Sequence, residues 1–288
     1  MKLYNILFEQ QLKLLTPEQM KAPESAYNHL TVVKPNTSNY STPEYAMVTW
    51  SEAGETGFVL FHVRNFKKAL ELQTTNAYES YLCAYAGTTE EHYDDCSGAV
   101  EISYMVRSPQ YPGAGGAMYA LVSDYFGKPI TSDRQSSTSD SAKKAWARIE
   151  TDPNWSKNEL DNWIEDANYD TNEIFRKWFK FDGTWPNRVV KSTDEEGNPE
   201  EAGPRTPNDE SDDCKLPDKV ADNRSANKYI GTGNAWSYNG PLNAHDLIDQ
   251  ASVEFTKLAK VADERTLMRT LKSNANSMFL KYYKGVGG

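Results

Sequence analysis

The chain has 288 residues, of which 38% are hydrophobic and 12% aromatic, and its formal net charge is -10. This length suits one large domain or a domain with an extension, and seven Trp and seventeen Tyr residues supply apolar surface for a real core, which excludes wholesale disorder. An acidic surface repels nucleic-acid phosphates and no Lys/Arg run offsets it, so direct nucleic-acid binding is not expected.

The cysteine pattern and the absence of long apolar runs limit where the protein acts. Cys83, Cys96 and Cys214 are an odd number without CxxC spacing, which argues for a reducing compartment and against a disulfide framework or a metal site. No apolar run approaches the ~18 residues of a membrane span, and no secretory signal peptide is visible. We therefore expect a protein that is neither embedded in a membrane nor secreted.

Residues 1–43 are predicted to form a short helix followed by an irregular arm. Leucine and isoleucine recur at near-helical spacing over residues 1–15. Residues 16–43 contain several prolines and turn-forming clusters and show little periodicity.

Residues 44–152 are predicted to be the core, because strand and helix patterns alternate along them. Strands are expected over residues 45–50, 58–63, 81–86, 99–107 and 129–132, the first two joined by a glycine-containing hairpin at 51–57. Helices are expected over residues 66–72, 116–126 and 142–149. Along the fourth strand, Val100, Ile102, Tyr104 and Val106 alternate with more polar residues, which is typical of a half-polar strand. This mixture predicts an α+β fold.

The remainder is predicted to be an extension, residues 153–240, and a C-terminal helix pair, residues 241–288. Short helices are expected over residues 158–167 and 173–179, and a small hairpin over residues 229–238. Residues 191–226 are rich in Asp, Glu, Pro, Asn and Ser, which predicts a long acidic surface loop. The two C-terminal helices are expected to be packing helices capped by Asn243 and Asp263.

The strongest functional signal is the segment 110–116, QYPGAGG, between the fourth strand and the following helix. Glycines in that position let backbone N–H groups approach an anion, and the helix dipole adds a favourable potential. The segment is not a Walker A loop, because no Lys follows Gly116, and it is not a dinucleotide fingerprint, because Met118 stands where GxGxxG needs glycine. The turn is therefore predicted to hold another phosphate-bearing cofactor.

The spacing Gln110-x-x-Gly113-x-Gly115 resembles the Q/R-x-x-G-x-G/A loop of the GNAT superfamily of acyl-CoA N-acyltransferases. The order strand, loop, helix, strand, helix agrees, and the resemblance covers residues 45–150. It implies a GNAT-like central mixed sheet flanked by helices, a helical C-terminal extension, and acetyl-CoA as co-substrate. A glycine-rich turn in another α+β fold would produce the same sequence pattern, and this is the alternative interpretation.

The resemblance also implies which residues act. In this family the loop cradles the CoA pyrophosphate, while the preceding strand is splayed, holds pantetheine and polarises the thioester carbonyl. An amine attacks the thioester directly, and a base, often Glu, accepts the amine proton; Glu101 lies where such a base is often found, although an exposed strand carboxylate is the alternative. Carried onto this chain, the implied cofactor-binding residues are Met105, Val106, Arg107, Gln110, Gly113, Ala114, Gly115 and Gly116.

Two features depart from the family pattern. Trp146 stands where the acid tyrosine is expected, and an indole does not usefully donate a proton to a thiolate. Tyr104, Ser141 or solvent would then serve as the acid, or the domain no longer catalyses. The two helices usual between the first and second strands are not evident.

Two further resemblances concern bacteriophage proteins. Residues 129–149 and 211–214 are similar to phage GNAT-like proteins with an extended C-terminus, in which Asp212 and Asp213 would attract a cationic acceptor; a solvated acidic loop is the alternative. The first nine residues, MKLYNILFE, resemble head-targeting leaders that are cut after Leu/Ile-x-Glu, and an ordinary docking helix is the alternative.

These features leave three hypotheses about function. The first is a phage-encoded N-acyltransferase that modifies an amine of a small molecule or protein in the host cytoplasm. The second is a non-catalytic virion or internal head protein that contacts other virion proteins. The third is an inhibitor of a host defence enzyme, with residues 191–226 as a DNA mimic.

Overall fold

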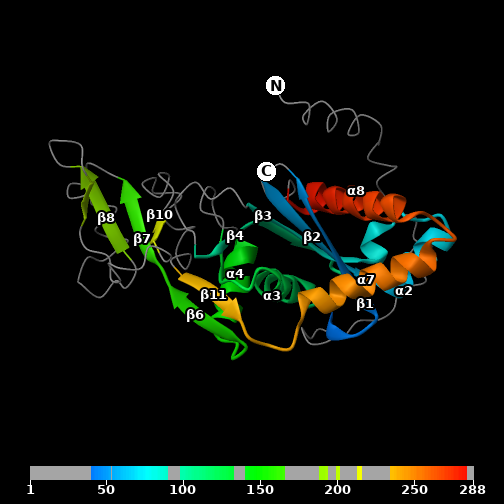
Figure 1. Cartoon of the computed structure of the whole chain (residues 1–288), viewed down its shortest axis with the longest axis horizontal. Coiled ribbons are helices and arrows are strands. Elements are labelled where there is room, and N and C mark those ends of the chain that lie inside the picture. Colours follow the sequence, from blue (N-terminus) through cyan, green and yellow to red (C-terminus); the bar gives the residue numbers. More distant parts are fainter. Residues whose placement is uncertain are drawn as a thin grey trace, which may run out of the picture.

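The computed structural model describes residues 40–52, 54–89, 98–132, 140–165, 188–193, 199–201, 213–215 and 234–283. Its centre is a mixed seven-stranded sheet in the order β1-β2-β3-β4-β5-β11-β6 (Figure 1). The strands are β1 (Tyr45–Glu52), β2 (Glu55–His62), β3 (Leu82–Thr89), β4 (Val100–Arg107), β5 (Ile130–Ser132), β6 (Trp155–Glu159) and β11 (Asn234–Tyr238). Neighbouring strands are antiparallel except β4 and β5, which are parallel.

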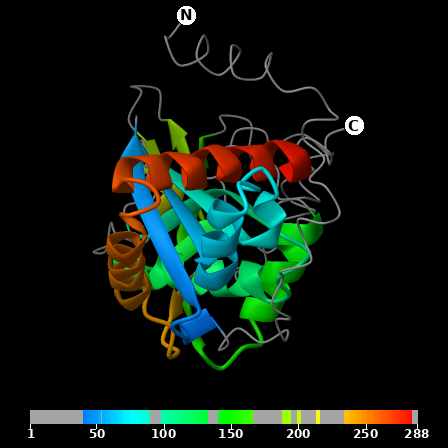
Figure 2. The same cartoon turned by 90° about the vertical axis from the view of Figure 1, so that its right-hand side faces the viewer.

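Helices cover both faces of this sheet (Figure 2), which confirms the predicted α+β class. They are α2 (Val63–Glu71), α3 (Ala114–Phe126), α4 (Asp140–Ile149), α7 (Ala244–Leu258) and α8 (Glu264–Tyr283), with a short turn of 3-10 helix, η3 (Tyr78–Ser80). One core lies between the sheet and α3 and α4, and includes Met118 and Trp146. The other lies between the sheet and α2 and α8, and includes Phe66 and Leu271; α7 contributes to both.

The predicted hairpin between β1 and β2 is confirmed, and its turn is shorter than expected. Glu52 pairs with Glu55, and Gly54 adopts a φ of 81° that favours glycine. The helix after β2 begins at Val63 rather than at residue 66, because His62 caps it. The imidazole Nδ1 of His62 accepts a hydrogen bond from the N–H of Asn65 at 3.2 Å.

A β-bulge in β4 divides its apolar side chains between the two faces of the sheet. Gly87 pairs with Tyr104 and Thr88 pairs with Ile102, so that Ser103 is an extra residue. Val100 and Ile102 accordingly lie in the α3 core, whereas Tyr104 and Val106 lie on the α8 side. The regular alternation predicted from the sequence was therefore wrong beyond Ile102.

Helix α3 begins two residues earlier than predicted. Gly113 precedes it with a φ of 86°, in the left-handed region that only glycine adopts readily, and Ala114 is the first helical residue. Gly115 and Gly116 therefore belong to the first helical turn rather than to a loop. At the other end, Gly127 (φ 59°) ends the helix as predicted.

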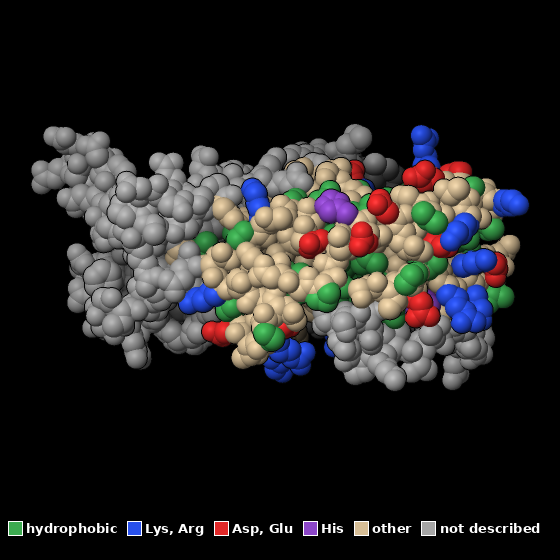
Figure 3. Space-filling view, turned by 60° about the horizontal axis from the view of Figure 1, so that its bottom comes forward, with side chains coloured by type: hydrophobic (Ala, Val, Ile, Leu, Met, Phe, Trp, Pro, Cys, Tyr) green, Lys and Arg blue, Asp and Glu red, His purple; other side chains and the backbone are tan. Residues whose placement is uncertain are grey.

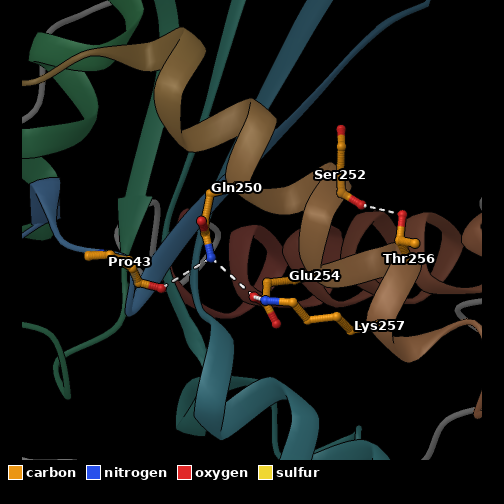
Figure 4. A network of polar contacts seen from close by, with 6 residues as sticks. All are labelled: Pro43, Gln250, Ser252, Glu254, Thr256 and Lys257. Carbon is orange, nitrogen blue, oxygen red and sulfur yellow. Dashed lines mark hydrogen bonds and ion pairs between the residues drawn. The ribbon is translucent and has the colours of Figure 1, made fainter.

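Helix α7 lies beside the edge strand β1 and is tied to the chain just before it (Figure 4). The side-chain amide of Gln250 donates to the carbonyl of Pro43 at 3.4 Å and to Glu254 Oε1 at 3.1 Å. Asn243 caps the helix as predicted, since its side chain accepts from the N–H of Asp246. The edge of the sheet is thereby covered, which protects it against pairing with another chain.

Helix α8 is held by polar contacts in its middle and near its C-terminal end. Asn274 donates to the hydroxyl of Tyr81 at 2.6 Å, and Lys281 forms an ion pair with the nearly buried Glu79 at 2.9 Å. The predicted cap is also present, because Asp263 Oδ1 accepts the N–H of Thr266 at 2.8 Å. Both C-terminal helices predicted from the sequence are confirmed.

The helix predicted over residues 158–167 was wrong, since residues 155–159 and 161–165 are strands. Leu160, Trp163 and Ile164 are spaced as on a helix, but β6 pairs with β11 over its whole length, from Trp155 with Tyr238 to Glu159 with Asn234. This long-range pairing overrides the local pattern. The hairpin predicted over residues 229–238 is replaced by β11, which lies between β5 and β6; residues 229–233 lie outside the described residues.

A second, four-stranded sheet has the order β10-β7-β8-β9. It consists of β7 (Asp161–Glu165), β8 (Arg188–Thr193), β9 (Pro199–Glu201) and β10 (Asp213–Lys215). The segment 191–226 is therefore not a plain surface loop. The helices predicted over residues 1–15 and 173–179 lie outside the described residues, as does the arm up to residue 39.

The surface that carries α7 is largely polar, with acidic and basic side chains interspersed (Figure 3). In the described part of the chain, the large apolar side chains that are well exposed are Leu72, Val253 and Val261. No described helix combines the length and the apolar composition that crossing a membrane requires.

Candidate functional site

The first turn of α3 presents free backbone donors. The N–H of Ala114 donates to the carbonyl of Tyr111 at 3.2 Å, and that of Ala117 donates to Gly113 at 3.1 Å. Among the residues that the structure describes, the N–H groups of Gly115 and Gly116 have no acceptor. Free N–H groups at the start of a helix are donors for an anion, and the helix dipole favours negative charge there.

Two side chains of β4 lie against this turn. A Cβ atom built on Gly115 would be 3.0 Å from Met105 Cε and 3.4 Å from Arg107 Cδ. Glycine thus allows these side chains to approach the helix closely. Arg107 and Gly116 are exposed, whereas Gly115 is buried. A guanidinium matches the geometry of phosphate oxygens.

The turn is anchored to the buried interior by tyrosines. Tyr40 donates its hydroxyl proton to the carbonyl of Pro112 at 2.8 Å. The fully buried Tyr111 donates to the carbonyl of Ser80 at 2.6 Å and accepts from the side-chain amide of Asn65 at 2.8 Å. The backbone of the turn is therefore fixed before any ligand binds, which lowers the entropy cost of binding.

Strands β4 and β5 separate next to this turn. They pair only at residues 100–102 of β4 and 130–132 of β5, whereas β4 continues to Arg107. Within the described chain, the second half of β4 thus has no strand partner on that side. The last residue of β5, Ser132, is 5% exposed, and its Oγ has no hydrogen-bond partner among the described residues. Because an unpaired buried hydroxyl is unfavourable by about 1–3 kcal/mol, a ligand atom or a water would stabilise it.

The two predicted catalytic residues lie on the other face of the sheet. Glu101 stands between Val100 and Ile102, whose side chains face α3, so its own side chain points to the opposite face. It is 8% exposed and pairs with Thr89 on one side and Thr131 on the other. Glu101 is therefore not the exposed strand carboxylate considered as its alternative.

Tyr104 lies beneath α8. Its hydroxyl is 2.6 Å from that of Tyr85, which in turn donates to Asn276 Oδ1 at 3.3 Å. Its ring centroid is 4.6 Å from that of Phe279, and the ring occupies the space that a side chain at Gly87 would need. These contacts describe a residue that helps to dock α8 on the sheet.

We expect Tyr104→Phe to lower the free energy of unfolding by about 1 kcal/mol, because it removes one partly buried hydrogen bond. Urea denaturation measures this change, and a double-mutant cycle with Tyr85→Phe isolates the contact between the two hydroxyls. Additive effects of the two substitutions would contradict the contact.

Trp146 belongs to the core rather than to a site. It is 8% exposed, and its ring centroid is 5.0 Å from that of Tyr119 on α3. Ser141, another candidate acid, is exposed in the first turn of α4. Asp213 begins β10, and Asp212 lies outside the described residues.

The structure brings together only part of the predicted site. Met105, Arg107 and the turn 113–116 lie together on the α3 face, and Gln110 is exposed at the start of the turn. Val106 packs on the α8 side, so it can serve a ligand at the turn only through its backbone.

Sequence reasoning did not identify Ser132 or His62. Ser132 follows Thr131 in a short polar strand end, and His62 precedes a helix without a usual capping sequence. Neither has a sequence signal, because both depend on burial created by distant residues.

Among the described residues there is no cluster of three or more His, Cys, Asp or Glu side chains that could hold a metal ion. Cys83 is free and buried, and burial raises the pKa of its thiol. Comparison with known proteins leaves the chain unassigned: no family model, no curated protein and no solved structure matches it.

Proposed function

We propose that the chain is a GNAT-like N-acyltransferase that uses acetyl-CoA as acyl donor and an amine as acceptor. One observation carries the proposal: α3 begins with the free N–H groups of Gly115 and Gly116, and Gly115 lies against the side chain of Arg107, the last residue of a strand that is unpaired with β5 beyond Ile102. The parallel pair of β4 and β5, with α3 between them in the chain, supports it.

The residues at the turn fit the chemistry of a pyrophosphate. The N–H groups of Gly115 and Gly116 donate to its oxygens, and Arg107 supplies the compensating charge. The unpaired edge of β4 offers backbone donors and acceptors to the amides of pantetheine, as a further strand would. Ser132 Oγ is a further hydrogen-bonding group at the point where the strands part.

Glu101 is the proposed general base, as the family resemblance implies; it lies on β4 beside Thr131 of β5, one residue before the two strands part, with its side chain on the face opposite α3. The amine nitrogen forms a bond to the thioester carbonyl carbon, the carbon–sulfur bond breaks, and CoA leaves as a thiolate. Glu101 accepts the amine proton, directly or through a water. Because Trp146 is packed in the core and Tyr104 is held beneath α8, solvent protonates the thiolate.

Isothermal titration calorimetry of the full chain with acetyl-CoA tests the proposal. We expect binding with a dissociation constant below about 100 μM, a free energy of about -5.5 kcal/mol, and weaker binding of acetyl-pantetheine, which lacks the pyrophosphate. Absence of binding up to about 1 mM acetyl-CoA would overturn the proposal.

A non-catalytic protein with a GNAT-like fold is the second candidate, acting in the phage virion rather than in the host cytoplasm. The observation that favours it is the burial of Trp146 where a proton donor is expected. Mass spectrometry of purified particles tests this candidate, and absence of peptides from residues 11–288 would exclude it.

A further inference from the structure

His62 lies at the junction between β2 and α2, directly behind the glycine turn. It is completely buried, and its ring centroid lies 5.1 Å from that of Tyr45 and 6.1 Å from that of Tyr111. Its Nδ1 accepts the N–H of Asn65, which makes His62 the cap of α2. Only an unprotonated Nδ1 can accept this bond, so the cap requires the neutral imidazole with its proton on Nε2.

A short chain of hydrogen bonds connects this cap to the turn. The side-chain amide of Asn65 donates to the hydroxyl of Tyr111 at 2.8 Å and to the carbonyl of Ser80 at 3.0 Å. Tyr111 also donates its hydroxyl proton to Ser80, and its carbonyl accepts the N–H of Ala114 at 3.2 Å. Asn65 therefore links the two: its backbone N–H binds His62, and its side-chain amide binds Tyr111 at the base of the turn.

The surroundings of His62 do not favour an imidazolium. The rings of Tyr45 and Tyr111 flank it, and burial raises the pKa of both phenols so that they stay neutral. In the part of the chain that the structure describes, Nε2 of His62 has no hydrogen-bond partner. Burial lowers the pKa of His62; among charged neighbours, Glu44 before β1 opposes this effect and Arg64 on α2 adds to it.

We propose that His62 is a positioning residue for the glycine turn: the neutral ring holds Asn65 and thereby Tyr111, and a proton on Nδ1 removes the cap and releases the turn. The effect of acetyl-CoA on the turn rests on the proposed function. The opening of the turn on protonation of His62 is independent of that function.

The sign of the pH effect follows from linkage. The folded pKa of His62 lies below the ordinary value of about 6.5, so the closed state binds fewer protons than an open state in which the ring meets water. Stability of the closed turn is therefore fully present above about pH 6.5 and is lost as the pH falls below it. Between pH 7.5 and 5.5 the population of the open state is expected to rise, by at most about tenfold.

Hydrogen–deuterium exchange of the full chain tests the inference through peptides that cover residues 62–70 and 111–118. Exchange is measured at pH 7.5 and 5.5 and corrected for intrinsic rates. In the wild type we expect opening to increase at the lower pH, by at most about tenfold. His62→Asn keeps an acceptor for the Asn65 N–H but does not titrate, so its opening is expected to be the same at both pH values.

Equal pH dependence in the wild type and in His62→Asn would overturn the inference. His62→Ala removes the cap and the titrating group together. In this variant the turn is expected to open more than in the wild type at pH 7.5, with no further rise in opening at pH 5.5. Acetyl-CoA at saturating concentration is expected to suppress exchange in residues 111–118. If acetyl-CoA has no effect but the free chain shows the pH response, the proposed function fails and the role of His62 stands.

Discussion

Gly115→Glu is expected to weaken acetyl-CoA binding about a hundredfold, which corresponds to about 2.7 kcal/mol. The new side chain would start 3.0 Å from Met105 Cε and 3.4 Å from Arg107 Cδ, next to the backbone N–H groups that are proposed to bind the pyrophosphate. Its carboxylate would pair with Arg107 and repel the phosphate oxygens. Calorimetry with acetyl-CoA measures the loss.

The matched control for this variant is Gly115→Gln, which has the same size without the charge. Both substitutions replace a helical glycine and both must displace the flexible end of Met105, so their stabilities are expected to be similar. The neutral variant is expected to bind acetyl-CoA at least about tenfold more tightly than the acidic one. Equal affinities of the two variants would show that no anion binds at this turn.

Leu271→Ala is expected to lower the free energy of unfolding by about 2–5 kcal/mol. Leu271 is fully buried between α8 and the sheet, in the core shared with Phe66 and Tyr81. The C-terminal helix is therefore part of the folding unit, although the sequence suggested a separate region from residue 241. Urea denaturation followed by tryptophan fluorescence measures the change and is expected to show a single transition.

Leu72→Ala is the control, because it removes the same atoms from a side chain that is 59% exposed. Its expected effect is within about 0.5 kcal/mol. A loss of stability as small as this in Leu271→Ala, or a separate early transition for α8, would contradict the described packing.

The strands and helices between residues 44 and 132 could be predicted because local signals agree with tertiary structure there. Gly54 and Gly127 stand where a positive φ is needed, and the turn 113–116 follows a strand pattern that is correct up to Ile102. The bulge at Ser103 could not be predicted, because it arises from the register between β3 and β4. That bulge decides which residues of β4 face the turn.

The candidate site was predictable in its backbone and much less so in its side chains. Gly113 is recognisable in the sequence because its positive φ requires glycine, and Gly115 because Met105 and Arg107 approach it closely. The burial of Glu101, the position of Tyr104 beneath α8 and the unpaired hydroxyl of Ser132 depend on helices and strands far along the chain. For the same reason, residues 158–165 look helical in isolation, although residues 158–159 pair with β11 and residues 161–165 form β7, which pairs with β8 and β10.

Glu159 pairs with Asn234, so the two ends of the segment between them lie side by side in the main sheet. Strands β6 and β11 are antiparallel neighbours in the main sheet, like the two strands of a hairpin, and residues 160–233 are the segment that connects them. The entropy of closing such a segment grows only slowly with its length, so the pair of strands tolerates a very large or a very small insertion at nearly the same stability. We therefore expect this edge of the sheet to accept insertions and deletions between residues 160 and 233 while the glycine turn, at residues 113–116, keeps its structure.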